Sequence, residues 1–486
     1  MWHEERLLID GELVAAEGNR TFATINPTTG ESLGTAADAS VDDAARAVAS
    51  ARRAFETTDW SRDVEFRVRC LRQLHGALVT HLDDLRPLLV AEVGAPLLLT
   101  EGPQLDTPVQ IVEWYADLLE KYEFQEDLGV IEARGGMHHR WVEKEAAGVV
   151  ASIVPYNFPL QISLAKLAPA LAAGCTTVLK GPPDTPWVTA AIGRLIAEHT
   201  DIPPGVVNVL TSDDHEVGAV LVTDPLVDMV SFTGSTATGR RIMEAASATV
   251  KKIFLELGGK SAFVVLDDAD PALAAMMAAF TVCSHAGQGC AITTRLLVPE
   301  AKQAKMIDVV AEMLGNVPYG DPADASKLMG PLISERQRDK VDGYVRAAVA
   351  DGARLVTGGR RPEDLPDGFF YEPTLLADVE PGAAVAQEEV FGPVLVVLPY
   401  RDDDDAVAIA NNTIFGLSGA VYGGDVERAT AVARRLRSGT VSINGGLYYG
   451  PDAPFGGYKQ SGIGREMGVA GLEEFLELKT LAKPAD

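Results

Sequence analysis

Short strand-like runs alternate with alanine-rich helical stretches along most of this 486-residue chain. Residues 160–173 and 189–198 are helical stretches of this kind, and apolar runs rich in β-branched residues flank each of them. Apolar strands that alternate with helices predict parallel sheets covered by helices on both faces. The clearest strand-like runs are 149–154, 176–179, 206–210, 229–233 and 262–266.

The first series of strands ends near Leu257-Gly258-Gly259, and a second series follows it. At roughly 100–200 residues per domain, the length of the chain allows two to four domains. We therefore expect a second α/β domain after these glycines. Its clearest strand-like runs are 295–298, 394–400, 420–422 and 440–443.

The charge balance is acidic, with 42 Lys and Arg residues against 69 Asp and Glu residues and a formal net charge of −27. Because nucleic acid and an anionic membrane surface would repel such a chain, we expect neither as a partner. No apolar run approaches the ~20 residues of a membrane span, and the first ten residues lack a signal-peptide stretch. Four cysteines are too few for a disulfide scaffold of this size, which favours a cytoplasmic location.

Cys290 ends the run Ala286-Gly287-Gln288-Gly289-Cys290. The glycines allow a close approach to a ligand, and a thiolate is a strong nucleophile once its pKa is lowered. A buried and inert cysteine is the alternative, and this run alone leaves both interpretations open. Cys283 and His285 lie nearby, but a structural zinc site needs a second ligand pair that is missing here. We therefore expect no metal and interpret His285 as a packed or surface residue.

Glu256 ends an apolar run and is followed by Leu257 and two glycines. Burial would raise the pKa of its carboxyl group toward neutrality and make it a plausible general base. A salt bridge to a lysine such as Lys260 is the alternative, and the residues alone do not decide between the two.

Asn157 follows a strand in the motif Pro-Tyr-Asn-Phe-Pro at residues 155–159. Its amide could donate to a developing oxyanion, although asparagine is also a common turn residue. The run 232–239 opens a helix after a strand, which suits a phosphate, but it matches neither the GxGxxG fingerprint nor a Walker loop. Lys180 ends another strand, where open α/β sheets tend to bind ligands, and a solvated lysine is the equal alternative.

The order and spacing of these motifs closely resemble the aldehyde dehydrogenase superfamily. The motifs Glu388–Pro393 and Pro454–Gly462 continue the resemblance, which covers nearly the whole chain. It implies an α/β fold with two open, doubly wound, Rossmann-like parallel-sheet domains and a small β oligomerisation arm. It also implies that the chain assembles as a homodimer or homotetramer.

The resemblance implies a role for each part of the chain. Residues 1–124 and 146–258 would form the nicotinamide-dinucleotide-binding domain, and residues 259–457 the catalytic domain with the nucleophilic cysteine. Residues 125–145 and 458–486 would form the oligomerisation arm and the C-terminal tail. Within these segments, residues 130–145 look like a hairpin and residues 475–481 like a strand.

Carried over by position, the resemblance implies that Cys290 is the nucleophile and Glu256 the general base. It implies that Asn157 and the backbone N–H of Cys290 donate to the oxyanion. Lys166 and Glu466 resemble positions thought to relay protons in relatives. The positions that match cofactor-binding residues are Pro155, Tyr156, Lys180, Pro183, Gly234, Ser235, Gly239, Leu257, Glu389 and Phe391.

We expect the substrate pocket to include Trp114, Ile292 and Phe455, which are apolar or aromatic. This lining favours aliphatic or aromatic aldehydes over phosphorylated or highly charged ones.

NAD is the expected cofactor, and NADP stays open. Pro183 falls where NAD-preferring relatives often place a glutamate on the ribose hydroxyls, and Asp184 comes one residue later. Without that carboxylate, the repulsion of a 2′-phosphate is weaker. Asp213 and Asp214 could themselves disfavour NADP.

The implied reaction oxidises an aldehyde to its carboxylic acid through a thiohemiacetal and a thioester on Cys290. Glu256 would activate the water that hydrolyses the thioester. Relatives that transfer the acyl group to coenzyme A generally lack this glutamate, so its presence favours hydrolysis over a coenzyme-A-acylating semialdehyde dehydrogenase. A non-catalytic binding or structural relative is a second alternative, and the presence of Cys290, Glu256 and Asn157 argues against it.

Overall fold

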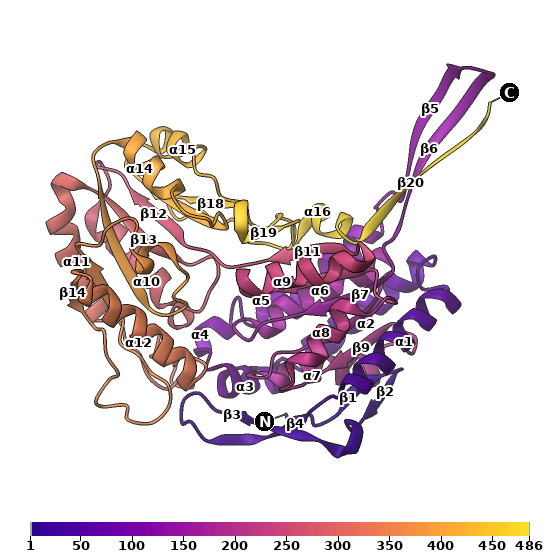
Figure 1. Ribbon diagram of the computed structural model, residues 1–486, viewed down its shortest axis with the longest axis horizontal. Coiled ribbons are helices and arrows are strands. Elements are labelled where there is room, and N and C mark those ends of the chain that lie inside the picture. Colours follow the sequence, from indigo (N-terminus) through magenta and orange to yellow (C-terminus); the bar gives the residue numbers. More distant parts are fainter. Residues whose placement is uncertain (1, 486) are drawn as a thin grey trace.

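The computed structural model describes residues 2–485, which form two large sheets and an arm that projects from one end (Figure 1). The first sheet has eight strands in the order β19-β11-β10-β7-β8-β9-β1-β2. Its five central strands run parallel to one another. They are β11 (Lys252–Glu256), β10 (Met229–Thr233), β7 (Val149–Ile153), β8 (Thr176–Lys180) and β9 (Val207–Leu210). The edge strands on one side are β1 (Leu7–Ile9) and β2 (Glu12–Val14).

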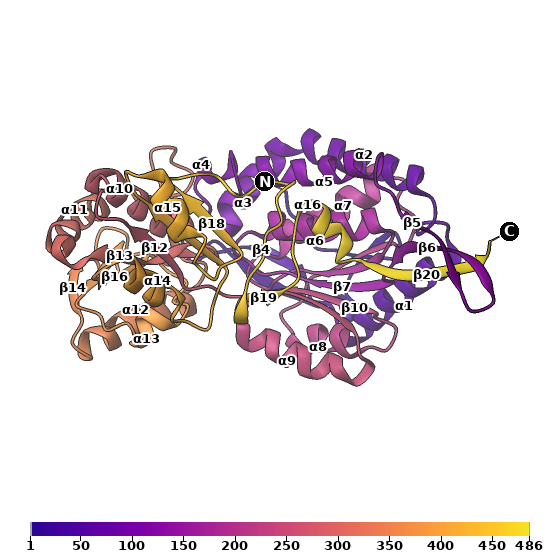
Figure 2. The same ribbon diagram turned by 90° about the horizontal axis from the view of Figure 1, so that it is seen from above.

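Helices cover both faces of this sheet because side chains alternate along its strands. Val149 and Ala151 of β7 pack in one apolar cluster, whereas Val150 between them packs in another. Figure 2 shows the helices of the two faces on opposite sides of the strands. One face carries α1 (Val41–Thr57), α8 (His215–Thr223) and α9 (Thr236–Ala246). The other carries α2 (Val64–Thr80), α5 (Asp106–Leu119), α6 (Pro159–Ala173) and α7 (Pro186–His199).

The order of the strands reverses between β7 and β10. From β7 the chain adds β8 and β9 on one side, and it then places β10 and β11 on the other. The carboxyl ends of β7 and β10 therefore flank a topological switch point, where open α/β sheets bind their ligands.

The second sheet has seven strands in the order β14-β15-β16-β13-β12-β17-β18, and all but β14 are parallel. It has its own apolar core, so both predicted α/β sheets are present. The strands are β12 (Ser261–Val265), β13 (Thr293–Pro299), β14 (Arg354–Thr357), β15 (Thr374–Ala377), β16 (Val394–Tyr400), β17 (Ser418–Tyr422) and β18 (Thr440–Ile443). The helices are α10 (Pro271–Cys283), α11 (Gln303–Gly315), α12 (Glu335–Ala350), α13 (Ala384–Gln387), α14 (Asp403–Asn411) and α15 (Val426–Ala433).

The projecting arm is a three-stranded antiparallel sheet, as Figures 1 and 2 show. Its strands are β5 (Gln125–Ala133), β6 (Gly136–Ala146) and β20 (Leu476–Pro484), so the predicted hairpin and C-terminal strand both form. Leu478 on β20 is 71% exposed and Val130 on β5 is 51% exposed. The arm thus presents apolar side chains to its surroundings.

The segment 458–475 packs on the first sheet, apart from the three strands of the arm. Its strand β19 (Gly462–Ile463) pairs with β11 at the edge of the first sheet, and its helix α16 (Gly468–Glu473) contacts α6. Gly462 allows this pairing because a Cβ there would lie 2.1 Å from the Leu255 carbonyl oxygen.

The chain crosses between the two large sheets twice, and the two crossings are bonded to each other. The Leu257 N–H donates to the Ser461 carbonyl oxygen at 2.8 Å. The Ser461 hydroxyl donates to the Gly258 carbonyl oxygen at 2.7 Å.

A separate two-stranded sheet consists of β3 (Thr21–Ile25) and β4 (Ser32–Ala37), and the remaining helices are α3 (Leu82–Val93) and α4 (Leu97–Thr100). Within residues 2–485, no helix combines the length and the apolar character needed to cross a membrane.

Candidate active site

The loop that carries Cys290 meets the first sheet at the crossing between β11 and β12. A Cβ at Gly259 would lie 2.3 Å from the Cys290 carbonyl oxygen, so only glycine permits this contact. Burial raises the pKa of the Cys290 thiol, and the carboxylates of Glu256, Glu389 and Glu466 raise it further. Residue Cys290 is partly exposed, whereas the other three cysteines are buried.

Glu256 is buried at the end of β11, and within residues 2–485 neither of its carboxyl oxygens has a hydrogen-bond partner. Burial raises the pKa of this carboxyl group well above its usual range, and Glu466 adds to the rise. The charges of Lys166 and Arg465 act in the opposite direction. The alternative of a salt bridge to Lys260 is wrong, because the Lys260 ammonium group lacks any hydrogen-bond partner in the described part of the chain.

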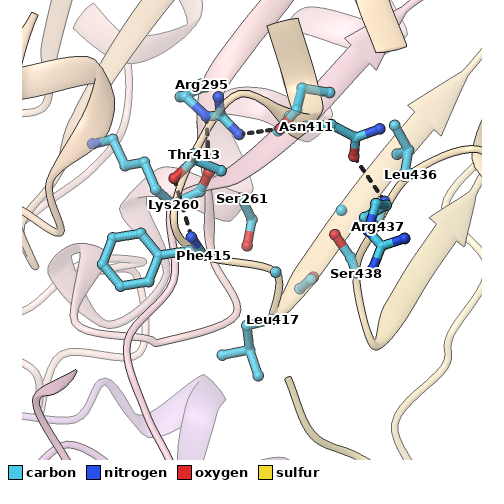
Figure 3. A pocket seen from close by; sticks show the side chains of 15 residues that line it. Lys260, Ser261, Arg295, Asn411, Thr413, Phe415, Leu417, Leu436, Arg437 and Ser438 are labelled. Carbon is cyan, nitrogen blue, oxygen red and sulfur yellow. Dashed lines mark hydrogen bonds between the residues drawn. The ribbon is translucent and has the colours of Figure 1, made fainter. Parts of the chain in front are cut away.

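Lys260 directly precedes β12, beside a small pocket of about 10 Å³ that has room for one water molecule. Arg295 donates to the Lys260 carbonyl oxygen at 2.8 Å and so fixes the start of this strand. In Figure 3 the Lys260 side chain extends away from Ser261 and Ser438. Burial lowers the pKa of Lys260 to about 7. Cys290, Glu256 and Asn157 are not among the residues that line this pocket.

A buried ion pair lies near Glu256. The Lys166 ammonium group is 2.9 Å from the Glu466 carboxylate and 3.2 Å from the Ser231 hydroxyl. It also lies 4.8 Å from the centre of the Phe254 ring. Both members of the predicted relay thus sit within electrostatic reach of Glu256.

Asn157 is buried just beyond the end of β7. Its side-chain amide nitrogen donates to the Gln288 carbonyl oxygen at 3.0 Å, in the loop that leads to Cys290. Its own backbone carbonyl accepts from the Gln104 side chain at 2.8 Å. Because an amide nitrogen carries two hydrogens, one remains to reach a substrate oxygen.

The carboxyl ends of β8 and β10 present the features that a dinucleotide needs. Lys180 is buried, and burial lowers the pKa of its ammonium group to about 8 although Asp213, Asp214 and Asp38 act against this fall. Ser235 caps α9 by accepting from the Thr238 N–H at 3.2 Å. The free N–H groups of that helix end suit a pyrophosphate.

Two further contacts shape the cofactor side. A Cβ at Gly239 would lie 2.7 Å from the Leu257 side chain, so glycine lets these two predicted positions pack together. The Tyr156 and Phe391 rings meet edge to face at 6.1 Å. Phe391 has a φ of 60°, and its carbonyl oxygen accepts from the Gln337 side chain at 2.7 Å. We find that these residues fit a nicotinamide dinucleotide.

Glu389 and Cys290 both contact the glycines that link β11 to β12. Its carboxylate accepts from the Gly259 N–H at 3.0 Å, and a Cβ at Gly258 would lie 2.5 Å from its other oxygen. Burial raises the pKa of Glu389, while the charges of Lys340 and Lys260 lower it.

A cavity of about 540 Å³ opens between the first sheet, β3 and the start of α12. Pro183, Asp184, Asp213 and Arg336 are among the residues that line it. Burial raises the pKa of Asp184, and the Arg336 guanidinium group lowers it. Sequence reasoning missed Arg336 because nothing local in α12 indicates that it faces the β8 loop.

The predicted substrate residues lie among further aromatic groups. The Phe455 ring meets the Tyr449 ring edge to face at 5.7 Å, and the Tyr449 hydroxyl accepts from Gln161 at 2.5 Å. Trp114 of α5 packs edge to face on Tyr115 at 5.0 Å, and Ile292 packs beside Gly289. Sequence reasoning missed Tyr449, although the adjacent pair Tyr448-Tyr449 before Phe455 was a visible signal.

His285 is buried, so its side chain is packed rather than on the surface. Its ring meets the Phe158 ring edge to face at 5.3 Å, and burial lowers the pKa of the imidazole to about 4. Among residues 2–485, no three His, Cys, Asp or Glu side chains gather as a metal site would require.

The comparisons with known proteins identify the chain as an NAD-dependent oxidoreductase. The model of the aldehyde dehydrogenase family matches residues 13–481, and the chain therefore belongs to the aldehyde dehydrogenase family. A 3-succinoylsemialdehyde-pyridine dehydrogenase from a Pseudomonas species is 41% identical over 477 residues, which are 97% of each chain.

Solved structures agree with this assignment. A betaine aldehyde dehydrogenase from Staphylococcus aureus, in complex with NAD+, superposes with a TM-score of 0.95 at 37% identity, over 99% of this chain and 94% of that one. Aldehyde dehydrogenase C from Pseudomonas syringae, a Cys-to-Ala mutant with NAD+ and octanal, gives a TM-score of 0.94 at 37% identity, over 100% and 98% of the two chains.

Proposed function

We propose that this enzyme oxidises an aliphatic or aromatic aldehyde to its carboxylic acid, with NAD+ as the hydride acceptor and water as the acyl acceptor. The observation that carries the proposal is the buried and unpaired carboxyl group of Glu256, at the crossing whose glycines contact the Cys290 loop. No protein group in the described chain forms a hydrogen bond with this carboxyl group. Its oxygens are therefore available to accept a proton from a water molecule, as a general base does.

The first step forms a bond between Cys290 Sγ and the aldehyde carbon. The thiol first releases its proton to solvent, and the thiolate then attacks while the carbonyl electron pair moves onto oxygen. The free Asn157 N–H and the backbone N–H of Cys290 are the proposed donors to this oxyanion. NAD+, when bound, accepts the hydride that leaves the carbon, so the aldehyde is oxidised to a thioester on Cys290 and the cofactor is reduced.

The second step is hydrolysis. Glu256 takes a proton from water as the water oxygen bonds to the thioester carbon. The carbon–sulfur bond then breaks, the carboxylic acid leaves and Cys290 is regenerated. Lys166 and Glu466 are proposed to pass the proton onward from Glu256, which is supported by their buried ion pair at 2.9 Å.

The residues proposed to hold the cofactor come from both sheets. Lys180, Gly234, Ser235 and Gly239 belong to the first sheet and its helices, and Glu389 belongs to the second. NAD is proposed over NADP because Asp38, Asp213 and Asp214 surround Lys180 with negative charge. The NAD+ complexes of the two structural relatives support the same choice.

The proposal extends to the substrate and the assembly. The aromatic groups around Tyr449 and Phe455 favour an apolar aldehyde, and the octanal complex of the Pseudomonas syringae relative supports an aliphatic one.

The exposed apolar side chains of the arm support a homodimer or homotetramer. We infer a reducing cytoplasm as its location because all four cysteines are free.

A matrix of aldehydes against NAD and NADP, with and without coenzyme A, tests the proposal. We expect reduced-nicotinamide absorbance to rise with apolar aldehydes and NAD, at a rate that coenzyme A leaves unchanged. A requirement for coenzyme A would replace hydrolysis with acyl transfer to a thiol.

A further inference from the structure

The loop before Cys290 has an unusual backbone. Three consecutive residues adopt left-handed conformations, with φ of 47° at His285, 52° at Ala286 and 74° at Gly287. Gly287 has no room for a side chain, because a Cβ there would lie 2.1 Å from the Gly392 carbonyl oxygen. Residues with side chains rarely take this conformation, so the surroundings must hold the loop in place.

The side chain of Gln288 supplies that hold. It is fully buried, and its amide nitrogen donates to the His285 carbonyl oxygen at 3.2 Å. The same nitrogen lies 3.4 Å from the Pro331 carbonyl oxygen. Its amide oxygen accepts from the Ile333 N–H at 2.9 Å. Gln288 thus ties the left-handed loop to the segment before α12.

The backbone of Gln288 holds a second group, on the other sheet. Its carbonyl oxygen accepts from the Asn157 amide nitrogen at 3.0 Å. A side-chain amide is planar, so fixing one N–H sets the direction of the other. Gln104 completes the arrangement by donating to the Asn157 carbonyl oxygen at 2.8 Å. Asn157 follows β7 of the first sheet and Cys290 precedes β13 of the second, and Gln288 bonds the first of these loops to the second.

We propose that Gln288 is a positioning residue that aligns the free N–H of Asn157 with the oxyanion formed on attack by Cys290. This inference rests on the proposed function, which assigns the oxyanion to Asn157. Gln288 moves no proton and touches no reacting atom. It sets where the donor points, and an oxyanion donor acts only when its direction matches the developing charge.

Two reactions of Cys290 separate this role from a purely structural one. Acylation by p-nitrophenyl acetate forms a tetrahedral oxyanion and releases nitrophenolate, whereas alkylation by iodoacetamide displaces iodide at a saturated carbon and forms none. In Gln288→Met, which keeps the length of the side chain and loses its hydrogen bonds, we expect acylation to slow about 10- to 100-fold. Alkylation should stay within about twofold, because the thiol itself is unchanged.

A double-mutant cycle with Asn157→Ala identifies the partner. If Gln288 acts through Asn157, the double variant acylates no more slowly than Asn157→Ala alone, within about twofold. Multiplied losses, or an equal fall in acylation and alkylation in Gln288→Met, would overturn the inference.

Gln387→Met is the matched control, because it also loses two amide-to-carbonyl bonds, to Pro381 at 2.6 Å and Asn412 at 2.9 Å. It should leave both rates unchanged. If Gln288→Met does not fold, Gln288→Glu takes its place, since it keeps the acceptor for the Ile333 N–H and loses the donor. The same ratio of rates then decides the question.

Neither reaction needs NAD or hydride transfer. A wild-type enzyme that is acylated normally but oxidises no aldehyde would therefore contradict the proposed function and leave the inference about Gln288 intact. An unchanged ratio of acylation rate to alkylation rate in the Gln288 variant would contradict the positioning role of Gln288 and leave the proposed function intact.

Discussion

Gly456 lies so close to Glu256 that a Cβ at this glycine would come 2.6 Å from the Glu256 carboxyl oxygen. The close approach is also part of the reason that the carboxyl group is buried. A side chain at residue 456 would therefore displace the carboxyl group of the proposed base.

We predict that Gly456→Ala lowers kcat by about 100-fold, because a shift of about 1 Å in the base misplaces the attacking water. Gly352→Ala is the matched control, since Gly352 has a φ of +103° but no atom within 4 Å of its Cβ position. Steady-state kinetics of both variants measure the effect. Equal kcat values would show that Glu256 tolerates displacement.

Replacing Glu256 by Gln should separate the two halves of the reaction. The variant keeps the thiol, so a single burst of reduced nicotinamide should appear, followed by slow turnover, whereas Cys290→Ala should give no burst. Rapid-mixing absorbance distinguishes the two. Normal steady-state turnover in Glu256→Gln would remove this residue from the role of base.

The pH dependence of kcat should follow the charges around Glu256. Because burial raises its pKa and only the deprotonated form is a base, kcat should increase as pH rises through that raised pKa. Lys166 lowers the pKa, so Lys166→Met should shift this rise to higher pH. Glu466 raises the pKa, so Glu466→Gln should shift it to lower pH. Profiles that do not move in opposite directions would contradict the assignment.

Cofactor choice should respond to Asp213. This residue is exposed and lines the cavity beside Pro183, where its carboxylate would repel a 2′-phosphate. Asp213→Asn should raise kcat/KM for NADP about fivefold and change that for NAD little, which corresponds to about 1 kcal/mol of charge repulsion. Asp308→Asn on α11 makes the same charge change elsewhere and should alter neither value. An equal gain with both cofactors would argue against a 2′-phosphate effect.

Assembly should depend on the arm. Leu478→Asp places a charge at an apolar position that is 71% exposed in the single chain. If another copy covers this position, the variant should sediment as a smaller species. Val426→Asp, at a 52% exposed position on α15, is the control. An unchanged sedimentation coefficient for Leu478→Asp would place the subunit contact elsewhere.

Local patterns were enough to predict the two sheets and most of their central strands, whereas β1, β2, β14 and β15 were not predicted. Runs such as 149–154 and 394–400 are apolar at nearly every position, which occurs when a strand is covered on both faces. The motif at 155–159 was placed correctly after a strand for the same reason.

Contacts between residues that lie far apart in the sequence could not be predicted from local patterns. Residues 458–475 carry short, glycine-broken elements, and nothing in them indicates that β19 would pair with β11 about 200 residues earlier. The sequence also left open whether Lys260 would pair with Glu256, because the four-residue separation does not reveal the intervening turn. Gln104 and Arg336 were missed for a similar reason, since each reaches the site from a distant element.

The two hydrogen bonds at Leu257 and Ser461 join the crossings between the two sheets. Glu256 directly precedes Leu257, so these bonds hold the junction at the residue next to the proposed base. The position of Glu256 therefore depends on a residue that lies about 200 positions later in the chain, and a substitution at Ser461 would disturb the proposed base without touching it.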